Sequence, residues 1–141
     1  MSRIAIVLMF ISLAFLPFAF AETIVSHENE KYFFKDGKME KFEGQYENTY
    51  HLNLENNRLT RTRVYDYQSK LITPDETVYQ IESTLKSHPT NAARFGVPPL
   101  IRAVGRPGKD TVEIILIEDD FVTTSTSMAG TFIFSRAKRL K

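Results

Sequence analysis

The residues best suited to chemistry in this sequence are three arginines and two tyrosines between positions 58 and 67. Arg58, Arg61 and Arg63 fall within six positions, and Tyr65 and Tyr67 follow them. A guanidinium forms paired hydrogen bonds to carboxylate or phosphate, and a tyrosine offers a ring for packing and a hydroxyl for hydrogen bonding. The segment could be a basic stripe for nucleic acid or membrane, a run of solvated charges, or the lining of a pocket. The direction in which the arginines point separates these interpretations.

The charge of the chain argues against a nucleic-acid surface. The sequence has 18 Lys and Arg against 17 Asp and Glu, and one of the basic residues is Arg3, in a segment that we expect to be removed. The mature chain would then carry 17 of each and no net charge. Nucleic-acid-binding domains usually have a clear basic excess. We therefore expect no nucleic-acid partner.

The first 21 residues have the three regions of a secretory signal peptide. A positive start at Arg3 precedes an apolar run from Ile4 to Phe20, and Ala19-Phe20-Ala21 has the pattern of a cleavage site. A membrane anchor is the alternative, but the run is at the short limit for a spanning helix and is interrupted by Pro17. We predict cleavage after Ala21, no stable membrane insertion afterwards, and a periplasmic or secreted protein of a bacterial host.

The chain contains no cysteine. Its absence excludes disulfides, a cysteine nucleophile, thiol redox chemistry and thiolate zinc sites. Residues 22–141 are enough for one domain with one core, and no repeat, linker or low-complexity tract divides them. We expect a single β-rich domain over 22–141 that depends on its core for stability.

The spacing of apolar residues predicts a mainly antiparallel β fold. A short strand and a turn at 35–38 are expected in 22–41, and residues 71–85 fit either a helix or a strand with a turn at Pro74-Asp75, of which we favour the strand. One short helix is expected near 89–95. Alternation or β-rich composition is clearest at 45–55, 58–67, 100–105, 111–117, 121–127 and 131–137. These elements indicate a small single-domain β-barrel or sandwich of about 6–8 strands.

The element that must position the arginines is a β-hairpin with a two-residue turn at Asn56-Asn57. Asn tolerates the left-handed conformation that such turns require. On the polar face this turn pairs Glu55 with Arg58. On the apolar, aromatic face the pairs are Leu54 with Leu59, Leu52 with Arg61, Tyr50 with Arg63, Asn48 with Tyr65, and Tyr46 with Tyr67. We therefore expect Arg61 and Arg63 to point into the fold.

Inward arginines need a counter-charge or solvent, because a buried unpaired guanidinium is too costly. Carboxylates of another strand, such as Glu82 or Glu113, could neutralise them. Alternatively, a barrel encloses a cavity in which they bind the anionic head of a ligand. The candidate ligand-binding residues are Arg61, Arg63, Tyr50, Tyr65 and Tyr67.

Arg63-Val64-Tyr65 also resembles the Arg-x-Tyr pair with which intracellular fatty-acid-binding barrels hold a carboxylate. The resemblance covers three residues and no more of the sequence. It implies a carboxylate ligand held inside a barrel.

No spacing in the sequence assembles a catalytic or metal site. The three histidines, at 27, 51 and 88, have no partner at ligand spacing, and Glu118-Asp119-Asp120 is typical of a solvated turn. Gly105-Arg106-Pro107-Gly108 fits a type II turn better than a nucleic-acid-binding loop. No serine-hydrolase motif is present. We expect no enzymatic activity, no metal and no cofactor.

The leading hypothesis is an exported, non-enzymatic β-domain that binds a small anionic or amphipathic ligand in a cavity or cleft. The alternative is an envelope interaction or inhibitor module that acts through surface loops, with candidates at 86–99 and 118–120. Its protein partner is not identified by the sequence.

Overall fold

The computed structural model describes residues 21–85 and 100–141. Over these residues the chain forms the strands β1 (Ala21–Lys35), β2 (Lys38–Glu43), β3 (Tyr46–Asn53), β4 (Arg58–Asp66), β5 (Leu71–Leu85), β6 (Leu100–Gly108), β7 (Thr111–Ile117), β8 (Phe121–Met128) and β9 (Thr131–Leu140). The mainly antiparallel β class is confirmed, with one strand more than the upper end of the expected range. The predicted helix near 89–95 and residues 1–20 of the predicted signal peptide lie outside the described residues. Within the described parts of the chain, no helix is long and apolar enough to cross a membrane.

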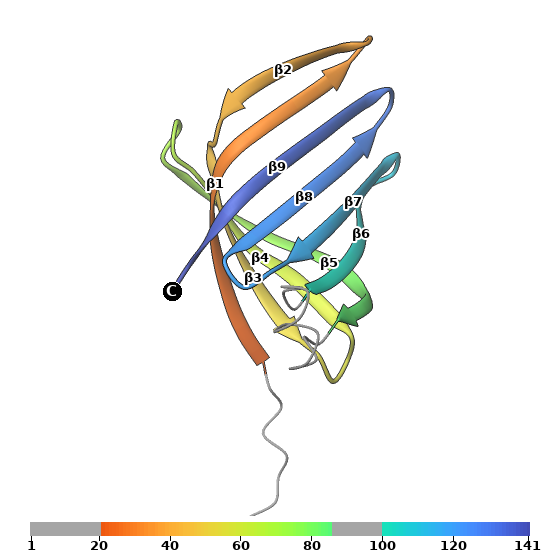
Figure 1. The fold of residues 1–141 in the computed structure, drawn as a ribbon. Coiled ribbons are helices and arrows are strands. Elements are labelled where there is room, and N and C mark those ends of the chain that lie inside the picture. The colour runs from red at the N-terminus through yellow and green to blue at the C-terminus, as the bar shows by residue number, and fades with distance from the viewer. Residues whose placement is uncertain (1–20, 86–99) are drawn as a thin grey trace, which may run out of the picture.

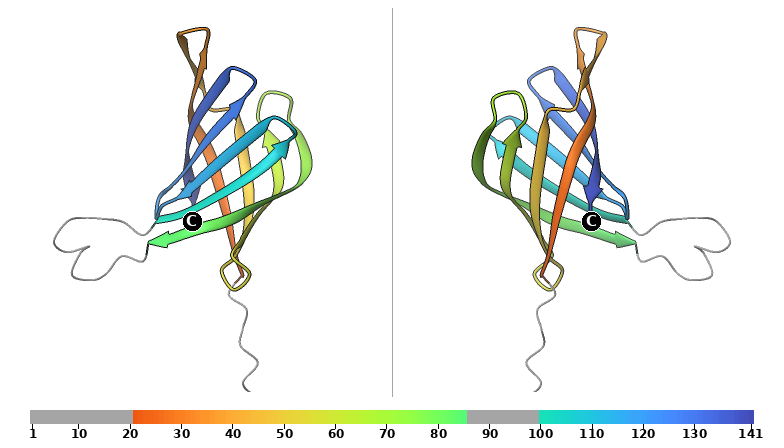
Figure 2. Two further views of the ribbon diagram at one scale, coloured as in Figure 1. Left: turned by 90° about the vertical axis from the view of Figure 1, so that its right-hand side faces the viewer. Right: turned by 90° about the vertical axis from the view of Figure 1, so that its left-hand side faces the viewer.

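Eight of the strands close into a barrel (Figures 1 and 2). From β3 to β9 each strand pairs with the next, β1 pairs with β3, and the additional pairing of β1 with β9 closes the ring. Every pairing is antiparallel. Closure leaves no free edge within the barrel itself.

The ninth strand, β2, lies outside the closed ring. The first half of β1 pairs with β3, whereas residues 30–35 of β1 pair with β2. The expected turn after Lys35 is confirmed at Asp36-Gly37, where both residues have positive φ. Figure 2 shows the resulting β1–β2 hairpin rising beyond the rim of the barrel. It extends one wall at the end of the barrel that also carries the β8–β9 turn (Figure 1).

The apolar core fills the opposite end of the barrel, which carries the β3–β4 and β7–β8 turns. Tyr79 is fully buried there, and its ring lies over Gly105, its partner on β6. A Cβ at Gly105 would lie 2.5 Å from that ring, so the glycine makes room for the tyrosine. The other buried apolar side chains are Ile24, Tyr50, Leu52, Leu59, Ile81, Ala103, Ile115, Ile117, Val122 and Ala137.

Two irregularities change which side chains point inward. The register of β1 against β9 shifts between Glu28 and Glu30, and the register of β4 against β3 shifts between Arg61 and Arg63. An extra residue in a strand reverses the alternation of faces beyond it. Consequently Glu28 and Lys31 both reach the interior although they are three positions apart, and the same holds for Arg61 and Val64.

Several expected turns differ from those observed. The β3–β4 connection has four residues, Leu54–Asn57, so Arg58 pairs with Asn53 and not with Glu55. Residues 71–85 are a strand, as we favoured, but the chain continues through Pro74-Asp75 without a turn. The turn expected at 106–109 is displaced to Lys109-Asp110, because β6 continues to Gly108.

Candidate functional site

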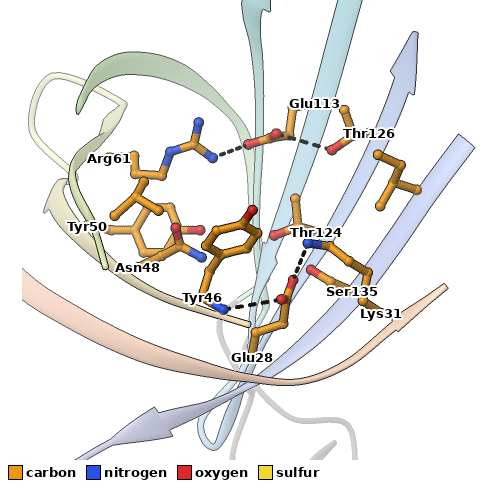
Figure 3. A pocket seen from close by; sticks show the side chains of 12 residues that line it. Glu28, Lys31, Tyr46, Asn48, Tyr50, Arg61, Glu113, Thr124, Thr126 and Ser135 are labelled. Carbon is orange, nitrogen blue, oxygen red and sulfur yellow. Dashed lines mark hydrogen bonds and ion pairs between the residues drawn. The ribbon is translucent and has the colours of Figure 1, made fainter. Parts of the chain in front are cut away.

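A cavity of about 270 Å³ lies inside the barrel above the apolar core (Figure 3). Most of the residues that line it are of polar type, and they come from six strands, β1, β3, β4, β7, β8 and β9. The lining residues are Glu28, Lys31, Tyr46, Asn48, Tyr50, Arg61, Val64, Glu113, Thr124, Thr126, Ile133 and Ser135. Only two of them, Val64 and Ile133, are aliphatic. A polar cavity between a closed barrel wall and a packed core can hold a small polar molecule or the polar head of a larger one.

Arg61 is neutralised by two carboxylates. Its Nη1 lies 2.8 Å from Glu113 Oε1 and its Nε lies 2.9 Å from Asp75 Oδ2. Glu113 is 6% exposed and also accepts hydrogen bonds from the Tyr79 hydroxyl at 2.5 Å and the Thr126 hydroxyl at 3.1 Å. The counter-charge expected from Glu113 is therefore confirmed for Arg61. Its other suggested source, Glu82, pairs with Arg102 at the surface.

The tyrosines beside this network are held in their neutral form. Burial raises the pKa of Tyr50 to about 12, although the nearby charge of Arg61 acts in the opposite direction. Burial and the adjacent Glu113 carboxylate raise the pKa of Tyr79 still further. Both hydroxyls therefore keep their proton throughout the physiological pH range, and that of Tyr79 donates to Glu113.

A second ion pair lies at the opposite wall of the cavity, on β1. Glu28 is 4% exposed and lies 3.4 Å from Lys31 Nζ. It also accepts the backbone N–H groups of Gln45 and Tyr46, at 2.9 and 3.4 Å. The carboxylate thereby fastens the β2–β3 connection to β1. The Lys31 ammonium in turn lies 4.3 Å from the centre of the Tyr46 ring.

The groups still able to bind a ligand are mainly hydrogen-bond donors. Glu28, Glu113 and Arg61 each have several partners already, whereas a lysine ammonium has three N–H donors and Lys31 has one carboxylate near it. Asn48 and Ser135 present an amide and a hydroxyl to the same space. Ser26, which pairs with Asn48, has a hydroxyl without a hydrogen-bond partner within the described residues, but it is fully buried and does not line the cavity, so it is not one of these groups. This set fits an acidic group better than a cation.

Only two of the five predicted site residues, Tyr50 and Arg61, line the cavity. Their inward placement agrees with the predicted face, although Tyr50 pairs with Arg61 and not with Arg63. The observed pairing of β3 with β4 differs from the predicted pairing by two positions. The same side chains still point inward, since the alternation of faces along a strand has a period of two. Arg63 and Tyr65 flank the inward Val64 and therefore belong to the outer face, which corrects the prediction. The cause is the extra residue Thr62, which has no partner on β3.

The outer face gathers the remaining predicted residues into a separate cluster. The Tyr67 hydroxyl lies 2.7 Å from His27 Nδ1 and 2.9 Å from Glu47 Oε2. The rings of Tyr65 and Tyr67 pack edge to face, 5.0 Å apart. Arg63 lies 6.0 Å from the Tyr65 ring. The Arg-x-Tyr segment therefore does not hold a carboxylate inside this barrel.

Several lining residues were not nominated from the sequence. Glu28 and Lys31 lie in the charged N-terminal segment, which has no alternation of apolar and polar residues that would identify them as inward. Tyr46 and Asn48 had been assigned to the inner face but not to a site. Within the described residues, no group of three or more His, Cys, Asp or Glu side chains is placed to hold a metal ion.

Comparison with known proteins supplies no family for the chain. No protein-family model matches it, and neither a curated protein nor a solved structure matches it.

Proposed function

We propose that this chain is an exported, non-enzymatic β-barrel that binds a small ligand with an anionic group in its cavity. The observation that supports the proposal is the cavity itself, which two cations line among the described residues: Arg61 has two carboxylate partners, whereas Lys31 has one. Arg61 already holds two carboxylates, so the ligand's acidic group is assigned to Lys31 with Asn48 and Ser135, and Tyr50 contributes to the wall. Export, to the periplasm or the medium, rests on the signal-like sequence of residues 1–21.

Native mass spectrometry of the protein purified from its own host tests the proposal. We expect a bound small molecule that dissociates from the wild-type chain on collisional activation. Lys31→Gln should lose this molecule because it removes the cation to which the acidic group is assigned. Lys41→Gln is the matched control, since Lys41 also lies 3.4 Å from a glutamate, Glu30, but is exposed. A wild-type protein without bound mass, or equal occupancy in both variants, would contradict the proposal.

A cavity-filling pair of variants gives a second test that does not alter charge. Ser135→Leu places a larger side chain in the cavity and should abolish binding. Ser125→Leu makes the same change on the neighbouring strand β8, between the inward Thr124 and Thr126, so its side chain points outward. Thermal unfolding of both variants shows whether the barrel is intact. If Ser135→Leu folds and retains the ligand, the ligand does not occupy this cavity.

The alternative of a loop-based interaction module has less support. Of its two candidate loops, residues 86–99 lie outside the described residues. The acidic turn at 118–120 is engaged by the chain's own C-terminal end, because Asp120 Oδ1 lies 2.9 Å from Lys141 Nζ and the Glu118 carbonyl accepts a hydrogen bond from Arg139. We therefore place function in the cavity.

A further inference from the structure

The β1–β2 hairpin continues the inner wall of the barrel beyond its rim. Lys31 lines the cavity, and the alternate residue Phe33 shares its face of β1. The register pairs Lys31 with Phe42 and Phe33 with Glu40, so Phe42 belongs to this inner face as well. The rings of Phe33 and Phe42 pack edge to face, 4.9 Å apart. The hairpin thus presents an aromatic platform directly above the polar cavity.

The cavity and this platform form one continuous groove. A second hollow, of about 250 Å³, shares Lys31 and Tyr46 with the cavity and is lined further by Phe33 and Phe42. A third hollow, of about 290 Å³, shares Phe33 and Phe42 with the second and extends over the hairpin to Lys35 and Lys38. Along the groove, the rings of Phe33 and Phe42 are therefore added to a lining that otherwise stays polar, since Asp36 and Glu40 also line the third hollow.

We infer that the ligand is amphipathic, with its anionic head in the cavity at Lys31 and its apolar part laid over Phe33 and Phe42. The inference rests on the proposed function and adds a ligand class and a role for β2. Phe42 is 45% exposed, and covering its ring and that of Phe33 with an apolar group is favourable. Lys31, at the junction of cavity and platform, is placed to hold the head where the apolar part emerges.

The alternative occupant of the hairpin is an extended segment of another protein that adds a strand to the edge of β2. The sequence of β2 opposes this, because Lys38, Glu40, Lys41 and Glu43 place charges along the strand, and charged edge strands resist such pairing. The inner face of the hairpin, and not its edge, is continuous with the cavity. A small amphipathic molecule is the occupant that contacts both the cavity and the inner face of the hairpin.

Calorimetric titration of the mature chain with two series of probes tests the inference. The first is acetate, butanoate, hexanoate and octanoate, and the second is the n-alkyl phosphates of the same lengths. Once the chain passes Lys31, each added methylene should tighten binding about fourfold, the value expected for burial of one methylene. Phe42→Ser should flatten this dependence and leave the affinity for the shortest binding acid unchanged. Met39→Ser is the control, because Met39 is exposed on the same strand but on its other face.

The outcomes distinguish this inference from the proposal that the cavity binds an anionic ligand. If acids bind with an affinity independent of chain length, or if Phe42→Ser and Met39→Ser behave alike, the aromatic platform is not part of the site and the inference is wrong. If neither series binds and the protein from its host carries no bound mass, the cavity proposal fails with it. Amide chemical shifts provide a second measurement, since octanoate but not acetate should move the signals of Phe33 and Phe42.

Discussion

Replacing Glu113 by glutamine tests the buried network between the cavity and the core. The Glu113 side chain is almost completely buried and receives three hydrogen bonds, from Arg61, Tyr79 and Thr126. Glutamine keeps the size of the side chain and one carbonyl acceptor. It removes the negative charge opposite a guanidinium whose side chain is only 15% exposed.

The cost follows from the partners that remain. Removing one member of a buried ion pair typically destabilises a protein by about 3–5 kcal/mol, because the other charge is left uncompensated. Arg61 retains Asp75 at 2.9 Å, which places the expected loss at the lower end, about 3 kcal/mol. For a domain of this size, each kcal/mol corresponds to a fall of about 4 °C in Tm, so Tm should fall by about 12 °C.

Urea unfolding at neutral pH, followed by far-ultraviolet circular dichroism, measures this loss. Glu82→Gln is the matched control, since Glu82 pairs with Arg102 where both side chains are substantially exposed, and it should cost less than about 1 kcal/mol. The double variant Arg61→Met with Glu113→Gln should recover part of the loss, because no uncompensated guanidinium remains. If Glu113→Gln is no more destabilising than Glu82→Gln, the buried pair of Arg61 and Glu113 does not contribute the stability assigned to it.

Three further predictions concern pH and backbone packing. Burial acts to raise the pKa of Asp75, but hydrogen bonds from Thr77 and the charge of Arg61 outweigh it and hold the pKa below its ordinary value. The Asp75 carboxylate therefore contributes stability above its pKa in the unfolded chain, about 4, and this contribution is lost as the pH falls through its pKa in the folded protein. The free energy of unfolding of Asp75→Asn should accordingly depend less steeply on pH in the acid range than that of the wild type. The raised pKa of Tyr50 has the opposite consequence, because its contribution to stability is present below the pKa of tyrosine in the unfolded chain, about 10, and declines above it. Tyr50→Phe should therefore make the free energy of unfolding depend less steeply on pH in the alkaline range. A Cβ at Gly44 would lie 1.6 Å from the Glu28 carbonyl oxygen, so Gly44→Ala should lower the free energy of unfolding by about 2 kcal/mol or more in thermal denaturation. A wild-type value would contradict the close packing of Gly44 against the β1 backbone.

Features that depend on neighbouring residues could be predicted from the sequence. Alternation placed Tyr46, Asn48, Tyr50 and Leu52 on one inner face of β3, and this face is confirmed because the first three line the cavity and the last is in the core. The strand expected at 111–117 coincides with β7. Strand period and turn-forming residues act over a few positions, so they can be recognised without the rest of the fold.

The charges that meet inside the barrel depend on the register of the whole fold. The extra residue at Thr62 sends Arg63 outward and leaves Arg61 inside, where Glu113, 52 positions away in the sequence, neutralises it. The shift between Glu28 and Glu30 likewise brings Glu28 and Lys31 to the same face. A one-residue bulge reverses every later side chain of its strand, yet it is selected by the pairing and closure of the whole barrel and by no local pattern. Composition and alternation could therefore predict an antiparallel barrel with charge near its interior, but only the register of the closed barrel showed that one arginine is already paired and that Lys31 faces the open cavity.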